Sequence, residues 1–160
     1  MTFVLIHRLK PAYTALVKQL DALQPLAQLA ARLFVAQAFI ASGLTKIADW
    51  ETTLALFADE YHVPLLPTAW AAVLGTGGEL VLPVLLALGL AGRFAAFGLF
   101  VLNIIAVLSL SEIAPAALQQ HQFWGSLLLG LLLWGPGRWA ADALLVPRLS
   151  STRPTASLTA

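Results

Sequence analysis

The sequence contains no cysteine and few charged residues, and each shortage excludes a class of protein. Without cysteine the chain cannot form a disulfide, a thiolate metal site or a dithiol redox motif of its own. Charged residues make up only 11% of the chain, whereas they make up about a quarter of a typical soluble domain. Hydrophobic residues make up 59%. This apolar surplus predicts a protein whose surface faces lipid. Because the chain has no cysteine, any redox chemistry needs a bound cofactor or a partner.

Long apolar stretches predict an all-α fold, an integral membrane bundle of four helices. Each is close to the length that crosses a hydrocarbon core of about 30 Å. They cover about residues 25–48, 70–92, 93–110 and 121–134, and the last continues past a Gly-Pro-Gly break to residue 146. Between the first two, residues 49–61 have apolar side chains at helical spacing, which predicts a short extracytoplasmic helix. Residues 25–146 are therefore predicted to form one transmembrane domain.

The two ends of the chain differ from this domain in composition. Residues 1–24 mix apolar and basic side chains, which predicts an amphipathic segment on the cytoplasmic membrane surface. Residues 147–160 are rich in Ser, Thr and Pro, which predicts a disordered tail. With the amino terminus inside, Lys46 is the one basic residue on the outer side, Arg32 lies within the first span, and the other seven flank the spans on the inner side. Both termini are therefore predicted to be cytoplasmic.

Glu79 is the one ionisable residue of the second span and lies near its middle. A carboxylate at that depth is costly, and it is kept where it faces the interior of a bundle and finds a partner. The helical rise places Gln37 and Asn103 at a similar depth on neighbouring spans, and Arg32 about a turn nearer the cytoplasm. We therefore predict a polar cluster of Arg32, Gln37, Glu79 and Asn103, in which the Arg32 side chain reaches Glu79.

This cluster has two interpretations. It forms either the floor of a pocket for a small ligand, a proton or a quinone head group, or a structural clasp whose members satisfy one another. The sequence favours the clasp, because buried ion pairs need no ligand. Lys46 is interpreted as an interfacial anchor. His62 and His121, on the outer side, are weak metal candidates because no ligand spacing connects them.

No pattern in the sequence indicates a catalytic centre. It contains no recognisable nucleophile with its base, metal-ligand set or nucleotide loop, so we do not expect the chain to catalyse a reaction alone. The glycines at positions 75, 77 and 78 do not indicate a phosphate-binding loop, because no Lys-Ser/Thr pair follows them. We expect the lipid bilayer as the surroundings of the chain and no nucleic acid as a partner.

Several short motifs, in order along residues 30–145, resemble the DoxX family of small four-helix bacterial membrane proteins, which are similar to the membrane subunits of thiosulfate:quinone oxidoreductases. They are Arg32-Leu-Phe, residues 42–50 (Ser-Gly-Leu-Thr-Lys-Ile-Ala-Asp-Trp), residues 57–64, Gly78-Glu79-Leu80, Leu88-Gly89-Leu90 with Arg93, and Gly135-Pro136-Gly137-Arg138-Trp139 with Asp142. The resemblance implies that Arg32, Lys46, Glu79 and Arg93 are the charged residues of the family pattern.

The resemblance further implies a membrane component of a redox or detoxification system in the bacterial inner (cytoplasmic) membrane. Such a component would be a membrane subunit of an oxidoreductase, with a soluble redox or stress-response partner and a quinone as the candidate cofactor near Glu79. Two alternatives stay open. One is a small transporter or proton-linked channel that uses Arg32 and Glu79 as a gated pair, and the other is a structural membrane anchor for soluble partners.

Overall fold

The computed structural model describes residues 2–63 and 65–145, and all the regular elements in these ranges are helices. They are α1 (Thr2–Ala48), α2 (Trp50–Asp59), α3 (Thr68–Leu88), α4 (Gly92–Ser109), α5 (Pro115–Trp134) and α6 (Ala141–Leu145). An isolated antiparallel bridge joins Tyr61 to Leu110. The prediction of an all-α chain is therefore confirmed for the described residues, whereas the predicted disordered tail lies outside them.

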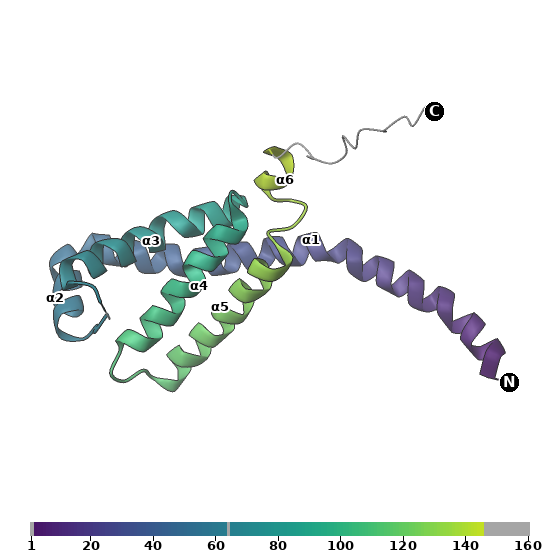
Figure 1. The fold of residues 1–160 in the computed structure, drawn as a ribbon, viewed down its shortest axis with the longest axis horizontal. Helices are drawn as coiled ribbons and strands as arrows, with labels where there is room; N and C mark the ends of the chain where they lie inside the picture. Colours follow the sequence, from purple (N-terminus) through teal and green to yellow (C-terminus); the bar gives the residue numbers. More distant parts are fainter. Residues whose placement is uncertain (1, 64, 146–160) are drawn as a thin grey trace, which may run out of the picture.

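Helix α1 is longer than the sequence predicts. It runs without a break through Pro25, where we expected a new helix to begin. The proline ring lacks an N–H, so this turn loses one hydrogen bond, to the Asp21 carbonyl, while the helix continues. With 47 residues, α1 is about 70 Å long at the usual rise, and its amino-terminal part extends well past the other helices (Figure 1). The placement of residues 1–24 on a membrane surface stays a prediction.

The long helices pack around a shared apolar core. Helix α1 contacts α3, α3 contacts α4, α4 contacts α5, and α5 contacts α1 (Figure 1). Apolar side chains from all four fill the centre, namely Val35, Phe39, Leu86, Ala95, Ala96, Leu99, Leu128 and Leu131. Most other large apolar side chains of these helices are exposed, as expected for a body that is surrounded by lipid.

Three of these helices are long and apolar enough to cross a membrane: α1 from Tyr13, α3 and α4. Helix α5 is 20 residues long but is not among the three. Its early turns contain Gln119, Gln120, His121 and Gln122, which lower its mean hydropathy. The multi-pass character of the chain is thus supported, while α5 as a fourth span stays a prediction.

Helix α2 covers one end of α1 and α3. The Asp49 side chain caps it, accepting hydrogen bonds from the Thr52 backbone N–H at 3.0 Å and from the Thr52 hydroxyl at 2.7 Å, and these bonds lower the pKa of the Asp49 carboxyl. The Thr53 hydroxyl donates to the Lys46 carbonyl at 2.9 Å. On the other side, Phe57 packs against the first turn of α3. These contacts fix α2 as a lid over this end of the helices.

The segment after α5 closes the opposite end. The N-cap residue of α4 is Ala91, which has no side-chain oxygen. Asp142 supplies one instead, because its two carboxylate oxygens accept hydrogen bonds from the N–H groups of Ala91 and Gly92, both at 2.8 Å. The Asp142 N–H donates to the Gly89 carbonyl at 3.0 Å. A carboxylate distant in the sequence therefore caps α4 and attaches α6 to the turn between α3 and α4.

This contact gives a first prediction. Replacing Asp142 by Ala removes the acceptor for two N–H groups at the start of α4, and we expect the free energy of unfolding to fall by about 1 kcal/mol. Asp142→Asn keeps one of the two acceptor oxygens and should cost less. Reversible unfolding of the three proteins in detergent measures both differences. Equal losses for Ala and Asn would show that the cap does not stabilise α4.

Candidate functional site

Glu79 forms an ion pair with Lys46. The Lys46 Nζ lies 2.6 Å from Glu79 Oε2 and also donates to the Ser42 hydroxyl at 2.8 Å. The two side chains are only 19% and 14% exposed, respectively. Lys46, which we expected to be an interfacial anchor, is therefore the partner of the mid-span carboxylate. Two opposite charges that are largely removed from water stabilise each other only while they stay together.

Close contact between α1 and α3 makes this pair possible. Gly43 lies on α1 directly against α3, where an added Cβ would come within 2.8 Å of the Leu80 side chain and 3.3 Å of the Glu79 Cβ. The absence of a side chain thus lets the two backbones approach beside Glu79. Lys46 is three residues further along the same face of α1, so its side chain reaches the carboxylate.

Arg32 lies elsewhere and has a different role. It is 1% exposed, and its guanidinium donates to the Ala87 carbonyl at 3.2 Å and to the Trp139 carbonyl at 3.0 Å. Ala87 belongs to the last turn of α3, where a cation also interacts favourably with the helix dipole. The expected contact between Arg32 and Glu79 is therefore absent: Glu79 pairs with Lys46, and Arg32 binds backbone carbonyls. Arg32 thereby connects α1 to α3 and to the closing segment, residues 135–145 after α5.

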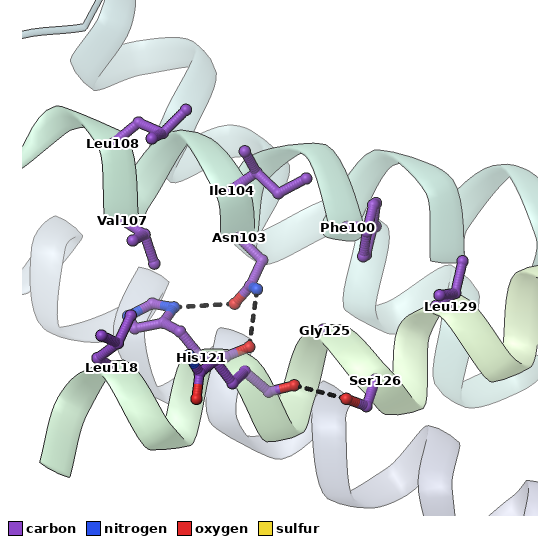
Figure 2. Close-up of a pocket in the computed structure, with 11 residues that line it drawn as sticks. Phe100, Asn103, Ile104, Val107, Leu108, Leu118, His121, Gly125, Ser126 and Leu129 are labelled. Carbon is purple, nitrogen blue, oxygen red and sulfur yellow. Dashed lines mark hydrogen bonds between the residues drawn. The ribbon is translucent and has the colours of Figure 1, made fainter. Parts of the chain in front are cut away.

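Asn103 pairs with His121 between α4 and α5, and Figure 2 shows the two side chains facing each other. The Asn103 Nδ2 donates to the His121 carbonyl at 2.9 Å, and its Oδ1 lies 2.8 Å from His121 Nδ1. Because Oδ1 can only accept, Nδ1 carries the hydrogen. A neutral His121 therefore has its free electron pair on Nε2.

The remaining predicted residues are not brought to Glu79. Gln37 is exposed, on the side of α1 that faces away from Lys46 and Glu79. The Arg93 guanidinium donates to the Leu133 carbonyl at 3.3 Å. His62 is exposed, with Nδ1 3.3 Å from the Glu60 carbonyl. Among the side chains that the structure describes, no group of three His, Asp or Glu residues is placed to hold a metal ion.

A cavity of about 210 Å³ lies beside the Lys46–Glu79 pair. Its polar lining comes from Ser42, Lys46, Tyr61, Glu79, Ser109 and His121, and the rest is apolar. A second hollow of about 380 Å³ lies between α4 and α5 and is lined by Asn103, His121 and mostly apolar side chains (Figure 2). His121 lines both, so the Asn103 pair lies at the boundary of the two spaces.

Tyr61, two residues after the end of α2, is the polar group that this part of the chain contributes to the cavity. Burial raises the pKa of its phenol, and the negative charges of Glu60 and Glu79 raise it further. Tyr61 therefore remains protonated at neutral pH and can donate a hydrogen bond. Together, the cavity offers the Lys46 ammonium and the Tyr61 hydroxyl as donors and the Glu79 carboxylate as an acceptor.

The sequence contained a signal for Ser42, which we did not place at this site. Ser42 and Lys46 are four residues apart, so a helix must bring them to one face. No comparable signal exists for Tyr61, because its position depends on how α2 folds back over α1 and α3.

Comparison with known families adds an independent finding. The family model for DoxX matches residues 27–112, more than half of the chain. The chain belongs to the DoxX family. The matched part includes Lys46, Tyr61 and Glu79 of this DoxX protein, whereas His121 and the closing segment follow it. Searches of curated proteins and of solved structures found no match to the chain.

A second prediction concerns Arg32. Arg32→Met leaves two carbonyl groups without their charged donor, and we expect the free energy of unfolding to fall by about 3 kcal/mol. Arg138→Met is a matched control, because Arg138 is exposed in the same closing segment. Thermal unfolding in detergent compares the variants. Similar stability of both would contradict the role of Arg32 as a structural clasp.

Proposed function

We propose that this DoxX protein is the membrane component of a redox or detoxification system in the bacterial inner membrane, and that the cavity beside Lys46 and Glu79 binds a quinone head group. The observation that carries this proposal is an apolar cavity that contains one ion pair together with a protonated tyrosine. A site of this kind, apolar with a few convergent polar groups, is typical of small-molecule binding.

The size and the chemistry of the cavity both support a single polar ring. A dry cavity of about 150 Å³ is enough to bind benzene, and this one measures about 210 Å³. A quinone has two carbonyl oxygens that accept hydrogen bonds, which Lys46 and Tyr61 would donate. The reduced form has hydroxyl groups that can donate to Glu79. The same three side chains therefore suit both redox states of the ring.

The hollow between α4 and α5 supports a ligand that arrives from the lipid. It is open and mostly apolar, and it meets the inner cavity at His121. An isoprenoid tail would suit this hollow while the ring occupies the inner cavity. Since we found no catalytic side-chain set in the sequence, we propose that a soluble redox or stress-response partner completes the reaction.

The two alternative functions, a transporter and a structural anchor, differ in their support. A transporter gated by Arg32 and Glu79 loses its basis, because these side chains bind Ala87, Trp139 and Lys46 instead. A structural anchor would keep the Lys46–Glu79 pair as a clasp with no ligand. Quinone binding therefore separates the proposed function from the anchor.

We expect the purified protein to bind a short-tailed ubiquinone, and Glu79→Gln to bind it roughly tenfold more weakly, which corresponds to about 1.4 kcal/mol. The substitution removes the charge that orients the Lys46 ammonium and replaces one acceptor oxygen with an NH₂ donor. Glu51→Gln is a matched control on the exposed face of α2, and Tyr61→Phe removes one donor without changing charge. Titration followed by tryptophan fluorescence, with mass spectrometry of extracted lipid, measures binding.

The outcomes of this titration are distinct. Weaker binding by Glu79→Gln and Tyr61→Phe, with Glu51→Gln unchanged, supports the quinone site. A folded, monodisperse wild-type protein that contains no quinone and does not bind one overturns it and favours the anchor.

The proposed orientation is tested separately. With both termini in the cytoplasm, α2 lies outside the cell, so a membrane-impermeant maleimide should label Asp59→Cys in intact spheroplasts and should not label Arg138→Cys. The chain has no cysteine of its own, so each variant carries one reactive thiol. The reverse labelling pattern would show that the orientation is inverted.

A further inference from the structure

Helix α1 carries an exposed stripe that runs along most of its length. In its first half the stripe consists of Tyr13, Leu16, Leu20 and Leu23, and all four are more than half exposed. The same alternation of three and four residues continues through Ala27, Ala30, Phe34, Gln37, Ala41 and Leu44, which are exposed as well. An average spacing of about 3.5 residues is the heptad repeat of a coiled coil.

The other side of α1 packs against the rest of the protein. Pro25, Arg32, Phe39 and Lys46 follow one another at intervals of seven residues, so they form a single row on the helix. Pro25, Arg32 and Phe39 are buried, and Lys46 pairs with Glu79 on α3. This row lies opposite the stripe. Phe34 touches the ring of Phe123 edge-on at 5.6 Å but remains 50% exposed.

Lipid cannot cover the whole of this stripe, because Tyr13 to Leu44 spans about 46 Å of helix. Helix α1 is about 70 Å long, and the hydrocarbon core is about 30 Å thick. The first half of a continuous α1 therefore extends into water, where its four large apolar side chains need another covering. A second copy of α1 covers the aqueous half and the membrane half in the same way.

Gln37 also indicates that a second copy of α1 covers the stripe. Its amide is exposed on the part of α1 that spans the membrane, on the side away from Lys46 and Glu79. An amide without a partner in hydrocarbon is costly. In a parallel symmetric pair, Gln37 faces Gln37 of the second copy, and each amide can both donate and accept. A single polar residue at such a position fixes the register of two helices, while Ala27, Ala30 and Ala41 allow close approach.

We propose that this DoxX protein forms a homodimer in which α1 pairs with α1 of a second copy as a parallel coiled coil. The two-fold axis then runs along the paired helices, and both cavities lie on the outer sides of the dimer. This inference does not depend on quinone binding, because the stripe and the cavity use opposite faces of α1.

Disulfide cross-linking in native membranes tests the dimer. In a parallel symmetric pair each seam residue meets its own copy, so single cysteines suffice in this cysteine-free chain. Oxidation should link Leu16→Cys, Leu20→Cys and Leu23→Cys strongly. Lys18→Cys is the matched control, because Lys18 belongs to the row of Pro25 and points away from the seam. Equal cross-linking at all four positions, or none at any, overturns the proposal.

Energy transfer between labelled copies in vesicles tests the register. Gln37→Leu should weaken dimerisation severalfold, and Gln37→Asn should retain most of it, because it keeps an amide. Unchanged transfer in Gln37→Leu contradicts the role of Gln37. If a lipid-phase quencher reaches labels at positions 16 and 23 and no cross-link forms, the stripe lies on the bilayer and the dimer is excluded.

Discussion

The Lys46–Glu79 ion pair is the interaction on which the end of the molecule nearest α2 depends. Two charges that are largely removed from water are stable only together, and removal of either leaves an uncompensated charge in an apolar setting. The pair therefore fixes the register of α1 against α3, which Gly43 allows by bringing the backbones close. The carbonyl of the same lysine holds α2 through Thr53. Lys46 of α1 therefore contacts both α2 and α3, and all three helices line the cavity.

Arg32 performs the corresponding task at the opposite end. It lies on the same row of α1 as Lys46, and their separation of fourteen positions corresponds to about 21 Å along the helix. One basic residue binds a carboxylate and the other binds backbone carbonyls, so α1 is held against α3 at two levels. The apolar core lies between these levels, and the cavity beside Lys46 and Glu79 lies at the end nearest α2.

The sequence alone supported the helical class, the positions of the apolar helices and the importance of Glu79. It did not reveal the partner of Glu79, because the choice between Arg32 and Lys46 depends on how far α1 is shifted along α3. Pro25 suggested a helix start, but the rest of α1 tolerates one lost hydrogen bond. Asn103 lay at the expected level, yet it faces α5 rather than α3. Such contacts depend on how each helix is rotated and shifted against its neighbours. The hydropathy of the sequence predicts neither quantity.

The bond between Asn103 and His121 has a consequence for the transfer of protons. The amide occupies Nδ1 of the ring and also holds the backbone carbonyl of the same residue, so the orientation of the imidazole is fixed. A proton that arrives at Nε2 changes neither of these hydrogen bonds. Protonation of Nε2 would therefore leave α4 and α5 joined by the same two hydrogen bonds. The joint between these helices thus does not depend on the protonation state of the ring.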